Sequence, residues 1–207
     1  VMPASFLVVL FYAIYLVVRN GVISYQKASG LAMFSGIVIF CFYSFIRLKE
    51  MLPVEEYGYD AIFFILLILC FAWGGDTCAY FAGRAFGKHK LCPVVSPKKT
   101  VEGAIGGVLG TMVFGVLVTV IYSIAADRME EFTRSNIGVS MYVIIALLAC
   151  VAAVLGIYGD LFASVVKRQC GIKDYGTIFP GHGGILDRFD SVMFIAPFVT
   201  MVEIGRA

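Results

Sequence analysis

The sequence predicts an all-α integral membrane protein that crosses the bilayer several times. Of its 207 residues, 60% are hydrophobic and only 14% are charged, whereas soluble domains carry about 25% charged residues. The apolar residues form long runs, and runs of about 20 residues match the roughly 30 Å hydrocarbon thickness of a bilayer. A net charge of +2 is too small to indicate a nucleic-acid partner. We expect about six or more transmembrane helices with a polar active-site cavity that faces the cytoplasm.

The expected spans are apolar runs between polar flanks. They are residues 3–18, 28–46, 61–82, 105–126, 139–158 and 191–202. The first run lacks the charged start and cleavage site of a signal peptide, so we expect it to span the bilayer. The chain begins with Val1 rather than Met, and we expect a fragment or a processed form. No connection is long enough for a soluble domain, so the sequence predicts one membrane domain.

Basic residues orient this domain, because short cytoplasmic loops collect Lys and Arg. The two longest polar connections, 83–103 and 159–190, are both rich in these residues. Two predicted spans separate them, so both lie on one side, which we expect to be the cytoplasm. The six cysteines form no CxxC pair and most lie in apolar runs. We expect small core residues rather than disulfides or zinc ligands.

The densest polar cluster lies between the last two predicted spans, in residues 160–190. Its acids are Asp160, Asp174, Asp187 and Asp190, and its cations include Lys167, Arg168, Lys173 and Arg188. Charges beside spanning segments are costly unless they pair, bind ions or line a wet cavity. Carboxylates suit Mg²⁺, and Lys and Arg suit phosphate oxygens. The cluster therefore predicts phosphoryl or nucleotidyl transfer, although the cations alone could also form a solvated loop.

The same cluster contains glycines around a histidine, because Gly181, Gly183 and Gly184 flank His182. Glycine allows backbone conformations that are closed to other residues and a close approach to a ligand. His182 is either a functional residue or a turn residue that caps a carbonyl. Asp187 and Asp190 are three residues apart, so a helical segment would place them on one face.

A second cluster surrounds Asp76, which follows a continuous apolar run and shares a helical face with Tyr80 and Gly83. A carboxylate at membrane depth is a functional-site candidate. The alternative is a structural ion pair with Arg84, about two turns further along the helix. Trp73 and Tyr80 could equally be interfacial anchors.

A third cluster, residues 96–103, precedes a helix that contains Gly106, Gly107 and Gly110. Thr100 is the expected N-cap, and the free amides of the next turn suit an anion. Lys98 and Lys99 could hold triphosphate oxygens, although the segment is not a Walker A loop. We expect the glycines of the helix to form a packing surface rather than phosphate contacts.

These motifs resemble the phosphatidate cytidylyltransferase (CDP-diacylglycerol synthase) family. The family signature S-x-[apolar]-K-R-x4-K-D-x-[small]-x2-[apolar]-P-x-H-G-G-x2-D-R-x-D is filled from Ser164 to Asp190, and the Asp76 and 96–103 elements occur in the expected order. The resemblance covers residues 73–207, which we expect to be the catalytic region. Residues 1–72 match only in hydropathy, and family members usually have further N-terminal helices.

The resemblance implies CTP and phosphatidate as substrates, membrane lipids as surroundings, and a homodimer in the bacterial inner membrane or its equivalent. It also implies Mg²⁺, which K⁺ could accompany. The metal ligands would be Asp160 and Asp187. The implied catalytic residues are Asp160, Asp187, Lys167, Arg168, Lys173, Asp190, His182 and Arg188. The implied substrate-binding residues are Asp76, Ser96, Lys98, Lys99, Glu102, Ser164, Gly183 and Gly184.

The expected reaction is direct attack of a phosphatidate oxygen on the α-phosphorus of CTP, with pyrophosphate leaving and no protein nucleophile. Nearby alternatives are a polyprenol kinase and a cytidylyltransferase for ether lipids. An ion-coupled transporter would use the acids as an ion pathway. It would leave the clustered cations unexplained, and no internal repeat relates the two halves of the chain.

Overall fold

A computed structural model of the chain describes residues 10–11, 13–15, 17–18, 25–128, 138–177 and 183–204. It divides into two compact units, Val1–Cys41 and Phe42–Ala207. The smaller unit contains the first part of helix α2 (Tyr25–Met51). Large apolar side chains on this part, such as Leu31, Met33 and Phe40, are exposed. Such a surface is expected of a helix that faces lipid.

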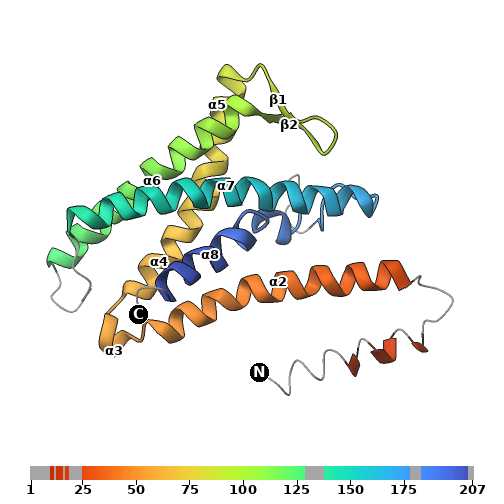
Figure 1. Cartoon of the computed structure of the whole chain (residues 1–207), viewed down its shortest axis with the longest axis horizontal. Helices are drawn as coiled ribbons and strands as arrows, with labels where there is room; N and C mark the ends of the chain where they lie inside the picture. Colours follow the sequence, from red (N-terminus) through yellow and green to blue (C-terminus); the bar gives the residue numbers. More distant parts are fainter. Residues whose placement is uncertain are drawn as a thin grey trace. The chain divides into compact units, whose positions relative to one another are not determined.

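The larger unit is built almost entirely of helices (Figure 1). After the end of α2 it contains α3 (Val54–Tyr57), α4 (Asp60–Leu69), the π-helix η1 (Cys70–Gly74), α5 (Gly75–Phe86), strands β1 (Lys90–Cys92) and β2 (Ser96–Thr100), α6 (Val101–Arg128), α7 (Val139–Gln169), the 3₁₀-helix η2 (Leu186–Arg188) and α8 (Val192–Ile204). The strands pair antiparallel, and their hairpin lies beyond the end of α5.

Four helical segments in the described part of the chain are long and apolar enough to span a membrane. They are Ser29–Met51, Asp60–Phe86, Val101–Arg128 and Val139–Gln169. The predicted fold class, an all-α polytopic membrane protein, is confirmed. Four of the six predicted spans correspond to these helices, and the last corresponds to the shorter α8. The first, residues 3–18, lies mostly outside the described residues.

Two features of the chain path differ from the sequence prediction. The polar connection expected from residue 159 begins as helix, because α7 continues to Gln169. The connection expected from residue 83 instead contains the end of α5 and the β hairpin. Both helices run past the edge of the apolar run, and the extension of α7 is stabilised by packing, because Gly159, Ala163 and Lys167 are buried.

α7 ends in a turn that closes its last carbonyl groups. Gly171 has φ +71°, and its N–H donates to the carbonyl of Arg168 at 3.1 Å, while the Ile172 N–H donates to that of Lys167 at 3.0 Å. This is the Schellman arrangement, in which a left-handed glycine ends a helix. It fixes the direction of the chain that leaves α7 toward the polar cluster.

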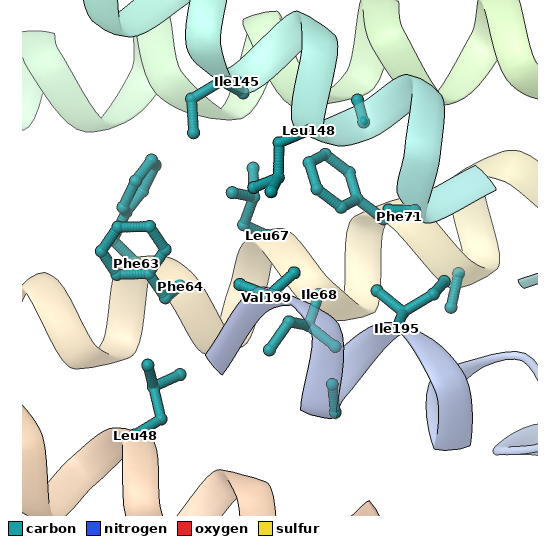
Figure 2. Packing of buried hydrophobic residues seen from close by; sticks show 14 of the residues in the cluster. Leu48, Phe63, Phe64, Leu67, Ile68, Phe71, Ile145, Leu148, Ile195 and Val199 are labelled. Atoms are coloured by element: carbon teal, nitrogen blue, oxygen red, sulfur yellow. The ribbon is translucent and has the colours of Figure 1, made fainter. Parts of the chain in front are cut away.

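The apolar core of the larger unit is centred on α4 and η1, whose side chains meet α7 and α8 (Figure 2). Phe63, Leu67 and Phe71 are at most 1% exposed. Ile145 and Leu148 of α7 cover them from one side, and Ile195 and Val199 of α8 from another. This core holds α4, η1, α7 and α8 together.

Helices α5 and α6 approach closely through small residues. A Cβ atom on Gly106 would lie 2.2 Å from the Ala82 Cβ, and one on Gly110 would lie 2.3 Å from the Cys78 Cβ. The glycines of α6 therefore form a packing surface, as the sequence predicts, because no larger side chain fits between the helices. α6 also begins as predicted, since Thr100 Oγ1 accepts the Gly103 N–H at 3.1 Å.

Candidate active site

A cavity of about 480 Å³ opens where α5, the β hairpin, the start of α6, α7 and the segment after residue 183 meet. The predicted site residues that line it are Asp76, Lys98, Lys99, Asp160, Asp187 and Asp190. They come from three clusters that are far apart in the sequence. The fold thus gathers the acids and the lysines of the 96–103 segment around one space.

Asp187 is the most constrained of these acids. Its Oδ1 accepts a hydrogen bond from Lys167 Nζ at 2.9 Å, and its Oδ2 accepts the backbone N–H groups of Tyr175 at 2.8 Å and Gly184 at 2.9 Å. Burial favours the neutral carboxyl, but the Lys167 and backbone hydrogen bonds prevail and lower the pKa of Asp187. Asp187 is therefore held as a carboxylate and ties together α7 and two loop segments.

Gly183 and Gly184 allow this arrangement. Gly183 has φ +84°, and a Cβ on it would lie 2.9 Å from Asp187 Oδ2. A Cβ on Gly184 would lie 2.9 Å from the Gly176 backbone nitrogen. These glycines thus allow a close approach to Asp187 and to the neighbouring backbone. The close approach to a ligand that the sequence predicts stays a prediction.

Tyr175 closes the same cluster from the α7 side. Its hydroxyl donates to the Ala163 carbonyl at 3.1 Å, and Lys167 Nζ lies 5.2 Å from its ring centroid. Burial and the nearby Asp187 raise the pKa of Tyr175 to about 12. The tyrosine therefore stays neutral and packs over the Lys167 ammonium.

Asp190 lies in a more negative environment than Asp187. It is 7% exposed, and its Oδ2 is 3.9 Å from Lys167 Nζ. Burial, followed by the nearby Asp160 carboxylate, raises the pKa of Asp190 to about 7, although Lys167 opposes the shift. The acids of the cavity are thus close enough to repel one another.

Asp160 faces the hairpin from α7. It forms an ion pair with Lys99 of β2, and Ser164 Oγ donates to its Oδ1 at 3.3 Å. Gly159 brings this turn of α7 against the Asp190 segment, since a Cβ on Gly159 would lie 2.6 Å from the Asp190 carbonyl oxygen. The ion pair links one proposed metal ligand to one proposed phosphate-binding lysine.

Asp76 enters the cavity from α5, directly after the π-helix η1. Its Oδ2 accepts a hydrogen bond from Ser191 Oγ at 3.1 Å. The alternative structural ion pair with Arg84 is not formed; Arg84 Nη1 instead lies 3.4 Å from the Tyr80 hydroxyl. Trp73 Nε1 donates to the Arg188 carbonyl at 3.0 Å, so the indole anchors the chain before Asp190 to η1, the segment that precedes α5.

Glu102 supports the hairpin from the first turn of α6. Its carboxylate accepts the backbone N–H groups of Lys88 at 3.1 Å and His89 at 3.2 Å, and it lies 2.6 Å from His89 Nδ1. The residue predicted to bind substrate thus holds the entry to the hairpin that carries Lys98 and Lys99. Its contacts within the chain are those of a positioning residue.

The remaining predicted residues lie around the cavity at varying distances. Lys167, Ser164, Gly183 and Gly184 support its acids through the contacts given above. Ser96 begins β2, and Arg168, Lys173 and Arg188 are exposed; none of these four is among the described residues that line the cavity. Their roles stay predictions. His182 lies outside the described residues.

Sequence reasoning did not assign two cavity residues, Tyr80 and Arg84. It named them only in alternatives, Tyr80 as an interfacial anchor and Arg84 as a structural partner for Asp76. The available signal was spacing, because residues 76, 80 and 84 are separated by four and share one face of a helix. All three line the cavity.

The donor set of the cavity fits a hard divalent cation. Four carboxylates line it among the described residues. Burial, and after it repulsion from Asp160 and Asp76, raises the pKa of Asp190, and a cation would relieve the repulsion. Among the described residues, no three His, Cys, Asp or Glu side chains are grouped so as to hold an ion. Mg²⁺ does not require such a group, because it usually takes one or two carboxylates together with substrate phosphates.

The chain is similar to known proteins over most of its length. The sequence profile of the Cytidylyltransferase family matches residues 1–204. A protein of Bacillus subtilis (strain 168) named phosphatidate cytidylyltransferase is 32% identical over 198 residues, which cover 96% of this chain and 66% of the relative. Proteins of the same name from Staphylococcus haemolyticus and Staphylococcus epidermidis are 39% and 42% identical over 145 residues, or 70% of this chain and 50% of each relative.

The chain spans between one half and two thirds of the length of these relatives. The matched residues include the whole described cavity, because the family profile extends from residue 1 to residue 204. The resemblance carried by the Ser164 to Asp190 signature is thereby confirmed, and the chain belongs to the cytidylyltransferase family.

Proposed function

We propose that this chain carries the active site of a phosphatidate cytidylyltransferase, which converts CTP and phosphatidate to CDP-diacylglycerol and pyrophosphate. The observation that carries the proposal is the mixed charge of the cavity at the end of three spanning helices. Acids from α5, α7 and the 187–190 segment face cations from α5 and β2 across it. A soluble nucleotide and a lipid head group could meet there while the acyl chains stay in the bilayer.

The chemistry requires no protein nucleophile. The attacking phosphatidate oxygen is already anionic, so the barrier consists mainly of charge repulsion and positioning. Lys98 and Lys99 on β2 would bind the phosphates of CTP and favour departure of pyrophosphate. Lys99 would exchange its partner Asp160 for a phosphate oxygen on substrate binding.

Asp160 and Asp187 would hold Mg²⁺, with Asp76 and Asp190 as supporting acids. The ion would supply Lewis-acid stabilisation of charge on the reacting phosphates. Asp187 would act from a fixed position, because its carboxylate is held by Lys167 and by two backbone N–H groups. Asp160 would gain freedom to bind the ion when Lys99 turns to the nucleotide.

We also propose that the cavity lies at the cytoplasmic face of the inner membrane or its equivalent, because the hairpin and the segment after α7 are rich in Lys and Arg. K⁺ could accompany Mg²⁺. A homodimer is expected from the family resemblance.

The test is an assay of the purified protein in detergent with labelled CTP, phosphatidate and Mg²⁺. We expect labelled CDP-diacylglycerol from the unmodified protein and none from Asp160→Asn. Arg128→Gln should still form the product, because Arg128 is the last residue of α6, whereas the cavity is lined by the first turn of that helix. In a parallel assay with a polyprenol in place of phosphatidate, phosphorylated polyprenol formed from CTP would support the kinase alternative. Ion flux in liposomes without any lipid product would support a transporter instead.

A further inference from the structure

The cations around the cavity differ in whether an acid already neutralises them. Lys99 is paired with Asp160, and Lys167 is paired with Asp187. Arg84 and Lys98 also line the cavity, but neither forms an ion pair with any acid in the described part of the chain. These two side chains therefore have positive charge available for a substrate.

Arg84 and Lys98 occupy different surroundings. Arg84 lies in the last turns of α5, inside the spanning segment Asp60–Phe86. Lys98 lies on β2, in the hairpin outside the spanning segments. Asp76 and Arg84 are eight residues apart on α5, so the acid and the cation are separated by about 12 Å along the helix axis.

The surface of α5 near Arg84 is apolar. Tyr80, Phe81 and Phe86 are 59%, 62% and 71% exposed, as expected for aromatic side chains at the edge of a bilayer. Arg84 is thus a cation that faces the cavity from a helix whose exposed surface suits lipid. A phosphate that reaches it can remain attached to acyl chains in the membrane.

The Arg84 guanidinium can also donate hydrogen bonds to two oxygens of one phosphate at the same time. Its one hydrogen bond in the described structure is from Nη1 to the Tyr80 hydroxyl at 3.4 Å. Arg presents five N–H donors in a planar fork, which matches two oxygens of one phosphate. Tyr80 would position the fork while most of its donors stay available.

We infer that Arg84, positioned by Tyr80, binds the phosphate monoester of the lipid substrate, whereas Lys98 binds the nucleotide. The inference rests on the proposed function for the identity of both substrates. It assigns the α5 side of the cavity to the lipid and the hairpin side to CTP. A phosphate monoester carries more negative charge and more free oxygens than the diester of ordinary phospholipids, so Arg84 would also favour phosphatidate over bulk anionic lipid.

The kinetic test varies one substrate at a time in mixed micelles. Arg84→Gln should raise the KM for phosphatidate at least about tenfold, as expected for loss of a charge-assisted hydrogen bond, and leave the KM for CTP within about twofold. Lys98→Gln should instead raise the KM for CTP at least about tenfold and leave the KM for phosphatidate within about twofold. Arg84→Lys, which keeps the charge but loses the fork, should fall between Arg84→Gln and the unmodified protein.

Lys88→Gln is the matched control. It removes one exposed cation four residues from Arg84, outside the cavity lining, and should change neither KM by more than about twofold. If Lys88→Gln reproduced the effect of Arg84→Gln, the effect would be general attraction to anionic micelles and the inference would be wrong. An equal rise in both KM values for Arg84→Gln would overturn it as well.

A binding measurement separates this inference from the proposed function. Native mass spectrometry without CTP or Mg²⁺ should detect dioctanoyl phosphatidate on the unmodified protein more strongly than dioctanoyl phosphatidylglycerol, and Arg84→Gln should abolish that preference. If this result is obtained but no CDP-diacylglycerol forms, the proposed function fails and the lipid site stands. If product forms but Arg84→Gln alters neither binding nor KM, the lipid site fails and the proposed function stands. Equal unfolding temperatures of the variants exclude misfolding as the cause.

Discussion

Lys167 Nζ lies 2.9 Å from Asp187 Oδ1, and the two side chains are only 10% and 7% exposed. The pair joins the end of α7 to the η2 turn, which are twenty residues apart in the chain. Asp190 shares the same ammonium at 3.9 Å. One lysine therefore balances two acids that line the cavity.

Lys167→Met should strongly destabilise the protein, because it leaves two buried carboxylates without their cation. Breaking a buried ion pair from one side costs about 3 kcal/mol or more. Thermal unfolding in detergent should show a clear decrease in Tm. Arg168→Met, which removes the neighbouring exposed cation, should shift Tm little. Equal Tm values for Lys167→Met and the unmodified protein would show that the ion pair contributes nothing to stability.

Gly183→Ala should lower turnover more than Gly171→Ala does. Both glycines have a positive φ, +84° and +71°, so alanine should cost each position about 1 kcal/mol of backbone strain. A Cβ on Gly183 would also press against the Asp187 carboxylate, whereas nothing lies within 4 Å of one on Gly171. Turnover by the two variants at one temperature measures the difference. A fully active Gly183→Ala would show that Asp187 need not keep its position.

Glu102→Ala should raise the KM for CTP several-fold and change kcat less, because it frees the segment that leads into the Lys98 and Lys99 strand. Glu102→Gln keeps an acceptor oxygen and should lie between Glu102→Ala and the unmodified protein. His89→Ala removes the imidazole contact but leaves the backbone donors, so its effect should be smaller. If Glu102→Gln instead abolished kcat with KM unchanged, the carboxylate would act on the substrate directly.

Asp190 should make stability depend on pH. Its pKa rises from 3.8 to about 7 on folding, so the folded state holds a proton that the unfolded state releases between these values. The contribution of this group to stability is therefore largest below pH 3.8 and declines as pH rises to about 7. In EDTA, Asp190→Asn should raise Tm at pH 8 more than at pH 5. A Tm difference independent of pH would show that Asp190 titrates normally.

The fold was largely predictable because membrane spans are determined by length and hydropathy. The runs at 105–126 and 139–158 contain few charges and became α6 and α7 with extended ends. The extensions depend on capping, such as the Gly171 turn, which hydropathy does not report. The π-helix at Cys70–Gly74 was not predicted either, because its sequence is as apolar as the helix around it.

The site was predictable in its residue types but not in its pairings. Asp160 and Asp187 were expected from the family resemblance, and both line the cavity. Their partners, Lys99 and Lys167, depend on how α7 meets the hairpin and the η2 turn, which are long-range contacts. Glu102 was expected to bind substrate because of the family resemblance, whereas its hydrogen bonds to residues 88 and 89 are visible only in the structure.

The most direct test of the central claim is the fate of two labels in one CTP molecule, ³²P at the α-phosphorus and ³³P at the γ-phosphorus. With phosphatidate, Mg²⁺ and the purified protein, we predict that ³²P enters the lipid fraction and ³³P leaves as pyrophosphate. Asp160→Asn should stop both transfers. Entry of ³³P into lipid, or unchanged transfer of ³²P by Asp160→Asn, would contradict nucleotidyl transfer in this cavity.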